Sequence, residues 1–399
     1  MSHFSEWPQR ASSLHELPLP DADAQAHSLR VLEQLRAEID AAGGALAFSR
    51  AMDLLLHAPG LGYYSAGARK LGAEGDFVTA PEISPLFSRT LARQCAELLR
   101  EIPAGELLEF GAGSGAMAAD MLLELEALGA LPPRYAILEI SADLRARQRQ
   151  TLLERAPRLL DRVVWLERLP EQFSGVMLAN EVLDAMPVQR FRWRDGAVIE
   201  LGVGWENGAL VWRALPDCSP RLRRRVQALA AEHGWSGVYE SEVNLAAEDW
   251  LGALAGALHA GVLLLFDYGF PAYEYYHPQR AGGTLMCHYR HRAHADPLIL
   301  PGLQDITAHV NFSAVAQAGA DAGLDVLGFA NQANFLIGGG LLELAAEAGD
   351  LRAQLEIAAQ LKRLLMPGEM GELFKVLALG RGLAEAGSAF ALRDDRHRL

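Results

Sequence analysis

The sequence reads LLEFGAGSG over residues 107–115 and then continues into a helix-forming run at 116–128. A short apolar strand is expected to end just before Gly111, and Gly113 and Gly115 lead the chain into the helix. Glycine lets the backbone turn tightly and approach a ligand closely, and a helix N-terminus presents N–H donors that have no partner within the helix. The stretch therefore predicts a site for a nucleotide-type cofactor, with a plain strand–helix turn as the lesser alternative.

The flanking residues favour S-adenosylmethionine as that cofactor. The pattern Gly-x-Gly-x-x-Ala, ending at Ala116, also fits a dinucleotide loop, so the glycines alone do not decide. An acid, Glu109, lies on the strand before the loop, and a second acid, Glu139, ends the next strand, where a carboxylate can accept hydrogen bonds from both ribose hydroxyls. Because nicotinamide enzymes also place an acid on the ribose, Glu139 does not separate the two cofactors, and a solvated strand-end acid is an equal alternative.

Two strands later, the sequence ANEVLDAMP at residues 179–187 places polar side chains at the carboxyl end of a strand. Ligands of open parallel sheets bind at that end. We expect Asn180 to line the cofactor cleft, with Glu181 and Asp184 beside it. These three residues could instead cap a following helix, since Asn and Asp are favoured at N-caps.

A histidine-rich stretch lies in a long loop expected at residues 268–307. It contains Cys287, His288, His291 and His294. Nothing in the pattern indicates a helix that would align the imidazole rings, and zinc sites usually show tighter ligand spacing. We therefore predict a polar active-site or surface loop, and no metal.

Predicted strands and helices alternate from residue 106 onward, which indicates βαβ units and a parallel sheet. The predicted strands are residues 106–110, 135–140, 163–166, 175–180, 262–266, 325–330 and 372–379, and helices are expected at 28–42, 46–57, 84–101, 220–233 and 245–259. Three strand-like runs within 188–215, separated by Arg-Asp-Gly and Glu-Asn-Gly, predict an inserted antiparallel β-meander. The predicted fold class is α/β, a Rossmann-like sheet with this meander and extra helices.

The same pattern predicts a division into parts. We expect a loosely ordered N-terminus (1–25), a helical region with a cofactor lid (26–104), the first half of the core (105–187), the meander with helices (188–260), and the second half of the core (261–385).

Composition restricts the class of protein. The 399 residues are 50% hydrophobic and 22% charged, and the net charge of −14 lacks the basic footprint that nucleic-acid binding needs. Three widely spaced cysteines provide no disulfide framework. The apolar runs are too short to span a bilayer, and the N-terminus resembles neither a signal nor a transit peptide. We expect a cytoplasmic protein with no nucleic-acid partner and no membrane insertion.

Over residues 45–380 the chain resembles the MidA-like family of S-adenosylmethionine-dependent methyltransferases. The segments that carry the resemblance are the glycine loop, GYY (62–64), GDFVTAPEIS (75–84), NEVLDAMP (180–187), DYG (267–269), GTL (283–285) with His288, QDITAHV (304–310) and MGELFKV (370–376). Many methyltransferases share the glycine loop, whereas the flanking segments are much more specific. One departure is Asn311, where the family usually has an aspartate; if that acid contacts substrate, we expect the substrate or its binding strength to differ.

The resemblance implies a seven-strand class I methyltransferase sheet whose last strand is antiparallel. The mitochondrial members of the family are complex I assembly factors that methylate protein arginine. The resemblance thus implies a protein substrate, with symmetric dimethylation of an arginine on a respiratory complex I subunit or its homologue.

Arginine methylation suggests roles for the acidic residues. Arginine is a poor nucleophile because its guanidinium stays protonated, and carboxylates on one edge both orient it and draw charge away from the attacking nitrogen. Glu181 and Asp184 are the leading candidates, with Glu82 as a third. The further candidates for substrate contact or proton acceptance are His288, Asp305 and His309, for which hydrogen bonding within a loop is an equal alternative.

The predicted cofactor-binding residues are Gly111, Gly113, Gly115, Glu139, Asn180 and Glu82. The glycines are expected to pass close to the methionine moiety and Glu139 to bind the ribose. We expect residues 63–84 to fold over the cofactor as a lid.

Three other functions stay open. The enzyme could methylate another protein or a small molecule, because function lives in the site and not in the fold. It could also be an assembly chaperone that binds S-adenosylmethionine for stability, with the meander at 188–215 as its docking surface. A nicotinamide oxidoreductase is disfavoured, because no second nucleotide-binding half is evident.

Overall fold

The computed structural model describes residues 17–65, 78–347 and 349–399, and the chain divides into two compact units. Unit 1 contains the described residues of 1–77, with 184–247 and 273–309. Unit 2 contains residues 78–183, 248–272 and 310–399. The segments predicted at 1–16 and 66–77, including part of the expected lid, lie outside the described residues.

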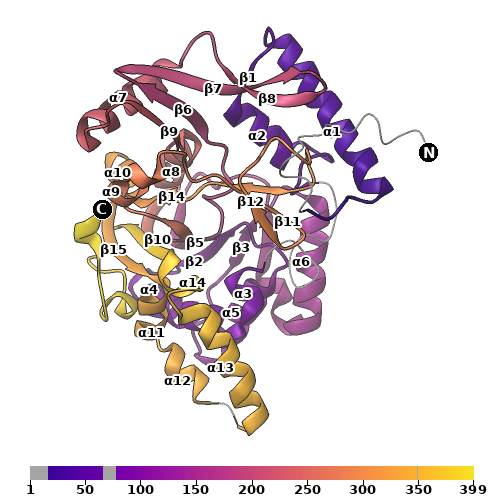
Figure 1. Ribbon diagram of the computed structural model, residues 1–399. Coiled ribbons are helices and arrows are strands. Elements are labelled where there is room, and N and C mark those ends of the chain that lie inside the picture. The colour runs from indigo at the N-terminus through magenta and orange to yellow at the C-terminus, as the bar shows by residue number, and fades with distance from the viewer. Residues whose placement is uncertain (1–16, 66–77, 348) are drawn as a thin grey trace. The chain divides into compact units, whose positions relative to one another are not determined.

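Unit 2 is built on a mostly parallel sheet with the strand order β15-β16-β10-β5-β2-β3-β4 (Figure 1). Its strands are β2 (Glu106–Phe110), β3 (Tyr135–Leu138), β4 (Val163–Leu166), β5 (Phe173–Asn180), β10 (Leu258–Phe270), β15 (Asp325–Asn331) and β16 (Phe374–Arg381), with β14 (Val310–Asn311) paired alongside β10. The strands β10, β5, β2, β3 and β4 are parallel, whereas β16 runs antiparallel to both β10 and β15. The prediction of an α/β protein with a large parallel sheet is thus confirmed.

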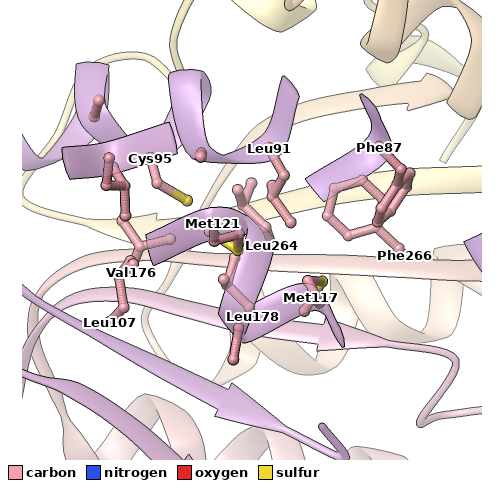
Figure 2. Close-up of a cluster of buried hydrophobic side chains, with 14 of the residues drawn as sticks. Phe87, Leu91, Cys95, Leu107, Met117, Met121, Val176, Leu178, Leu264 and Phe266 are labelled. Carbon is pink, nitrogen blue, oxygen red and sulfur yellow. The ribbon is translucent and has the colours of Figure 1, made fainter. Parts of the chain in front are cut away.

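The hydrophobic core of unit 2 follows from the two-residue period of its strands. Leu107 of β2 lies beside Val176 of β5, and Leu178 of β5 lies beside Leu264 of β10. These side chains pack with Phe87, Leu91, Cys95, Met117, Met121 and Phe266 in one buried cluster (Figure 2). One face of the sheet is thereby covered by α4 (Pro85–Glu101) and α5 (Ala116–Ala127), and α5 is the helix that the glycine loop enters.

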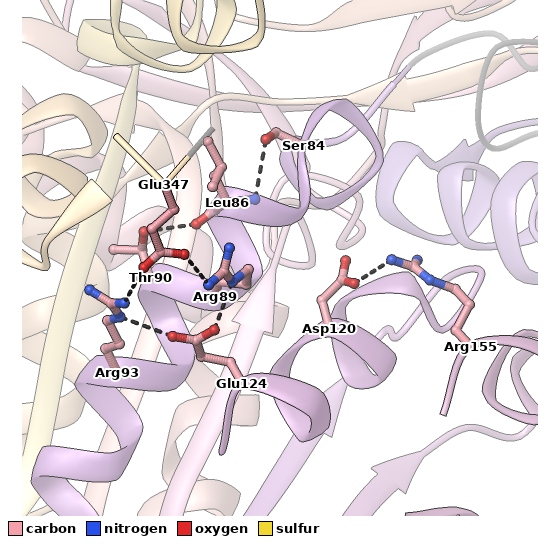
Figure 3. Close-up of polar contacts among 9 residues, drawn as sticks. All are labelled: Ser84, Leu86, Arg89, Thr90, Arg93, Asp120, Glu124, Arg155 and Glu347. Atoms are coloured by element: carbon pink, nitrogen blue, oxygen red, sulfur yellow. Dashed lines mark hydrogen bonds and ion pairs between the residues drawn. The ribbon is translucent and has the colours of Figure 1, made fainter. Parts of the chain in front are cut away.

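The other helices of unit 2 are α3 (Ala80–Ile83), α6 (Ala142–Arg155), α8 (Leu245–Ala257, whose first residues fall in unit 1), α10 (Phe312–Asp321), α11 (Gln332–Gly338), α12 (Leu341–Ala345), α13 (Leu351–Leu365) and α14 (Met370–Leu373), with short 3₁₀ turns at Pro157–Arg162, Ser388–Phe390 and Arg396–Arg398. Ser84 accepts a hydrogen bond from the Leu86 backbone N–H and so caps the N-terminus of α4 (Figure 3).

A cluster of charged side chains joins α4 to α5. The carboxylate of Glu124, which is buried, accepts hydrogen bonds from Arg89 Nε at 2.7 Å and Arg93 Nε at 3.0 Å (Figure 3). Both guanidinium groups also bind Glu347. Because one buried carboxylate bridges two cations, removing it leaves both arginines without their shared buried partner.

We expect Glu124→Gln to lower the free energy of unfolding by about 2 kcal/mol, since charge-assisted hydrogen bonds to a buried carboxylate are lost. Glu126→Gln is the matched control, because Glu126 lies on the same helix and pairs with Arg158, which is 71% exposed. Glu126→Gln should lower the free energy of unfolding by less than about 0.5 kcal/mol. Urea unfolding of both variants measures the difference, and equal losses would contradict the bridging role.

Unit 1 contains two antiparallel sheets. The first has the order β1-β7-β6-β9, and β8 also pairs with β7. The second has the order β12-β11-β13. The strands are β1 (Leu46–Ala47), β6 (Gln189–Arg194), β7 (Ala197–Glu206), β8 (Ala209–Ala214), β9 (Val238–Val243), β11 (Met286–Tyr289), β12 (Arg292–His294) and β13 (Asp305–Thr307). The helices are α1 (Ala22–Ala41), α2 (Phe48–His57), α7 (Pro220–His233) and α9 (Ala272–Tyr275), with a 3₁₀ turn at Pro278–Arg280.

Two helix predictions near the N-terminus need correction. Helix α1 begins at Ala22, inside the segment expected to be loosely ordered, because the Asp21 carboxylate accepts from the Ala24 N–H and caps the helix. The helix expected at 46–57 starts only at Phe48. Leu46 and the residue after it pair with β7 instead, where a Cβ at Gly202 would lie 2.3 Å from the Leu46 carbonyl oxygen, so this pairing depends on glycine.

The prediction of a single long loop at 268–307 is wrong in part. The central strand extends to Phe270, and the rest holds α9 and the three strands of the second sheet. Arg290 and His291 have φ angles of 48° and 61° and form the turn between β11 and β12. Strands of three or four residues show too little alternation to be predicted from the sequence. Strand β9 was missed for a related reason, since its polar residues mask the period.

Among the helices of the described residues, none is both long and apolar enough to cross a membrane.

Candidate functional site

The glycine loop leaves β2 in a left-handed backbone conformation at all three predicted glycines. The φ angles of Gly111, Gly113 and Gly115 are 64°, 52° and 84°. A Cβ on Gly111 would lie 3.0 Å from Val182 Cγ2, so the loop also lacks room for a side chain there. The backbone conformation therefore favours glycine at all three positions, and close packing adds to this preference at Gly111.

Glu82 lies beside this loop. The Ser114 hydroxyl donates a short hydrogen bond to Glu82 Oε1 and accepts from the Ala116 N–H at 3.2 Å. Ser114 thus links α3 to the first turn of α5. The structure therefore places the predicted acid Glu82 next to the glycines, although its position in the sequence is almost thirty residues earlier.

Glu139 follows β3 at the same edge of the sheet, where parallel strands end. Glu139 is 8% exposed. Its Oε1 accepts from the Ser141 N–H at 2.8 Å, and its Oε2 accepts from Gln148 Nε2 at 3.2 Å. A carboxylate has about four acceptor positions, so two remain for a ligand. Gln148 also donates to the Gly113 carbonyl oxygen at 3.2 Å, which connects Glu139 to the glycine loop.

A second buried acid, Glu109, lies within β2. Tyr135 donates a hydrogen bond of 2.7 Å to Glu109 Oε2, and burial raises the pKa of the Glu109 carboxyl from 4.5 to about 7. The folded state therefore holds this proton more tightly than the unfolded chain does. The protonated Glu109 therefore contributes to the free energy of unfolding at low pH, and this contribution is lost as the pH rises from about 4.5 to about 7.

We expect Glu109→Gln to remove this dependence, because an amide does not titrate. Relative to the unmodified protein, the variant should gain stability between about pH 5 and about pH 8, by up to about 3 kcal/mol. Urea unfolding of both proteins at the two pH values measures it. A stability difference that is the same at both values would show that Glu109 does not titrate in this range.

The next polar segment begins where β5 ends. Asn180 Nδ2 donates to Glu181 Oε1 at 3.2 Å, and the buried Asn180 Oδ1 has no hydrogen-bond partner among the described residues. Glu181 is held in a left-handed conformation, with φ of 54°, and its N–H donates to the Phe266 carbonyl oxygen. Such a conformation is uncommon for a residue other than glycine and often marks a functional site.

The alternative that Asn180, Glu181 and Asp184 cap a helix is wrong, because residues 181–188 form turns and the next element is strand β6. The segment is instead held by Asp267, which comes from β10. Its Oδ2 accepts from the Leu183 N–H at 3.0 Å and fixes the turn after β5.

In unit 1, the predicted residue Asp305 binds Tyr64. The Tyr64 hydroxyl donates to Asp305 Oδ1 at 2.8 Å, and Asp305 lies opposite His288 in the β11–β13 pair. Burial, then the negative charges of Asp305 and Asp184, raise the pKa of Tyr64 well above its ordinary value. His57 stacks on Tyr64 with ring centroids 5.6 Å apart. The structure therefore brings Asp305 next to His288, and the charge of Asp184 acts on the same tyrosine as Asp305.

His309 belongs to a different group in unit 1. Its N–H donates to Thr284 Oγ1 at 3.2 Å, and its Nδ1 lies 3.3 Å from the Thr284 carbonyl oxygen. Thr284 in turn donates its N–H to the buried Glu242, whose other oxygen accepts from Arg190. A Cβ on Gly283 would lie 2.2 Å from Glu242 Oε1, which explains the glycine in the GTL segment.

The histidine-rich stretch forms the β11–β12 hairpin. Cys287 and His294 are opposite each other in this hairpin, and His291 lies in its exposed turn. Over the ranges that the structure describes, no group of three or more His, Cys, Asp or Glu side chains could hold a metal ion.

Sequence reasoning missed Gln148, Tyr64 as a partner of Asp305, and Glu242. Gln148 lies in the polar helix α6, where nothing distinguishes it from its neighbours. The only signals for the other two were the Tyr-rich segment at 62–64, which contains Tyr64, and the GTL segment at 283–285, whose Thr284 binds Glu242.

Unit 2 fits S-adenosylmethionine. The left-handed glycines let the loop approach a ligand closely, the Glu139 carboxylate keeps acceptor positions for ribose hydroxyls, and the buried Asn180 Oδ1 lacks a donor among the described residues. These groups come from the ends of β2, β3 and β5, the edge where ligands of open α/β sheets bind.

Comparison with known proteins agrees with this fit. Residues 90–330 match the family described as "Putative S-adenosyl-L-methionine-dependent methyltransferase". A crystal structure of a Burkholderia thailandensis protein bound to S-adenosyl-homocysteine is 47% identical, with a TM-score of 0.92, covering 96% of this chain and 100% of that one.

Two curated relatives are named mitochondrial protein arginine methyltransferases. The mouse NDUFAF7 protein is 29% identical over 371 residues, or 84% of this chain and 81% of its own. The Drosophila melanogaster homologue is 28% identical over 407 residues, or 92% and 89%. Because these relatives are mitochondrial, the prediction of a cytoplasmic location is wrong. The chain belongs to this S-adenosylmethionine-dependent methyltransferase family, and it is an enzyme that uses S-adenosylmethionine.

Proposed function

We propose that this methyltransferase acts on arginine side chains of a protein substrate and forms symmetric dimethylarginine. The names of the mouse and fly relatives support arginine as the acceptor. The observation that carries the proposal is the acidic segment 180–184, whose backbone is fixed by hydrogen bonds from the Glu181 and Leu183 N–H groups to Phe266 and Asp267. A fixed carboxylate is what a planar guanidinium needs for orientation.

We propose the following roles for the chain's residues in methyl transfer. Bound S-adenosylmethionine supplies an electrophilic methyl group on a sulfonium. Gly111, Gly113, Gly115, Glu139, Asn180 and Glu82 are the proposed cofactor-binding residues. Glu181 and Asp184 bind the guanidinium edge and hold positive charge away from the attacking nitrogen. One proton leaves the guanidinium for each methyl group transferred, and Asp305, His288 and His309 are the proposed acceptors.

Tyr64 supports the role of Asp305. Because its raised pKa keeps the hydroxyl protonated, Tyr64 can donate to Asp305 across the ordinary pH range and hold one carboxylate oxygen in place. Two aspartates around one tyrosine favour a cationic substrate, in keeping with arginine.

We propose a respiratory complex I subunit, or its homologue, as the substrate protein. We also assign the unit 2 sheet to the seven-strand class I methyltransferase fold and the β6–β8 strands to an insertion. The boundaries at 104/105, 187/188 and 260/261 remain our proposed domain limits. Asn311 caps α10 by accepting from the Ala314 N–H, so an aspartate there could cap the helix equally well.

The acceptor is tested with tritiated S-adenosylmethionine and an extract of cells that lack this protein. Addition of the purified enzyme should place label in protein, and acid hydrolysis should release it as symmetric dimethylarginine. Label in another amino acid or in the small-molecule fraction would identify a different acceptor. Tight cofactor binding without any labelled product would favour an assembly chaperone.

A further inference from the structure

Helix α6 carries a fully buried glutamine whose polar atoms are all engaged. Gln148 Nε2 donates to the Gly113 carbonyl oxygen and to Glu139 Oε2, both at 3.2 Å, and Gln148 Oε1 accepts from Trp165 Nε1 at 2.9 Å. An indole N–H can only donate, so the amide oxygen must face Trp165. The amide NH₂ group must then face the two acceptors.

The backbone of Gln148 also contacts the glycine loop. A Cβ on Gly115 would lie 3.0 Å from Gln148 Cα and 3.2 Å from its carbonyl oxygen. The loop therefore packs directly on α6 at this residue. Gln148 thus contacts Gly113, Gly115 and Glu139, two segments that come from different strands of the sheet.

We propose that Gln148 is a positioning residue that holds the Glu139 carboxylate and the glycine loop in the arrangement that binds S-adenosylmethionine. The inference rests on the proposed role of Glu139 in cofactor binding and is independent of the methyl acceptor. With Ser141 on one oxygen and Gln148 on the other, the carboxylate is fixed before the ligand arrives, and its remaining acceptor positions point in set directions. The Trp165 N–H holds the Gln148 amide oxygen and so fixes the orientation of the amide.

The decisive variant is Gln148→Glu, which replaces the donor by a second carboxylate of the same shape. At about pH 8 the two carboxylates and the Gly113 carbonyl repel one another, and affinity for S-adenosyl-homocysteine should fall at least about tenfold. Two carboxylates in contact share a proton as the pH falls. The protonated residue can then donate to Glu139, so affinity should recover toward that of the unmodified protein at about pH 5.5.

Gln150→Glu is the matched control. Gln150 lies two residues along on α6, is exposed, and donates to Glu154 at 2.6 Å, so the same substitution again puts two carboxylates together. It should leave affinity unchanged at both pH values. Gln148→Met keeps the length of the side chain without a donor and should lose affinity equally at both.

Calorimetric titration with S-adenosyl-homocysteine measures all three variants, beside thermal unfolding. Unchanged affinity of Gln148→Glu at about pH 8, or an equal loss at both pH values, would overturn the positioning role. Should Gln148→Glu not fold, Gln148→Met decides, because it removes the donor without adding a charge: a severalfold loss of affinity supports the proposal and no loss overturns it.

Glu139→Gln separates this inference from the cofactor assignment. Normal affinity in Glu139→Gln would remove Glu139 from the site, and the inference with it. If Glu139→Gln loses affinity for S-adenosyl-homocysteine while Gln148→Glu binds normally, Glu139 stays assigned to the cofactor site. Only the role of Gln148 is then rejected.

Discussion

Gly113→Val is expected to abolish S-adenosylmethionine binding while the protein stays folded. Gly113 has φ of 52°, and a β-branched residue there costs about 1–2 kcal/mol in backbone strain alone. Its carbonyl oxygen also accepts from the buried Gln148, so relief of the strain would displace the loop from α6. A displaced loop would no longer bind the ligand through its backbone, and affinity should fall at least about a hundredfold.

Gly129→Val is the matched control for this change. Gly129 has a similar left-handed φ of 64°, just beyond the C-terminal end of α5, and a Cβ placed on it would have no other atom within 4 Å. The same strain is therefore introduced far along the helix from the loop. Calorimetry should show normal binding in this variant, together with a similar fall in melting temperature. Retained binding in Gly113→Val would contradict the cofactor assignment.

The second large effect is expected from the acidic segment. Glu181→Gln and Asp184→Asn should each lower kcat about a hundredfold or more, because an uncharged amide no longer stabilises and orients the guanidinium. Affinity for S-adenosyl-homocysteine should change little in Asp184→Asn, since Asp184 is not among the proposed cofactor residues. Methyl transfer measured with the labelled extract, beside calorimetry, separates the two effects.

Asp195→Asn provides the control for Asp184→Asn. Asp195 lies in the exposed β6–β7 turn with φ of 46°, a conformation that asparagine also tolerates. Its substitution should leave both kcat and affinity unchanged. Full activity in Glu181→Gln and Asp184→Asn would remove these carboxylates from the proposed mechanism and direct attention to Asp305.

Much of unit 2 could be predicted because its signals are local. The glycine loop and the apolar strands on either side each act over a few residues, and the strand ends placed Glu139 and Asn180 at one edge of a parallel sheet. The short strands β11 to β13 of unit 1 could not be predicted in the same way. Their pairing, which sets His288 opposite Asp305, is decided by contacts between segments and not by local preference.

By itself, the sequence determined the parallel α/β class and the glycine loop, because backbone preference and hydrophobic period depend on neighbouring residues. The flanking segments and their resemblance to known methyltransferases indicated the cofactor. Only the tertiary structure decided that Glu82 binds Ser114, that Tyr64 donates to Asp305, and that a buried glutamine joins the ribose acid to the loop. The partners in these pairs are separated by 9 to 241 positions in the chain. A side chain's hydrogen-bond partner depends on which groups folding brings within about 3 Å, and no local pattern records that.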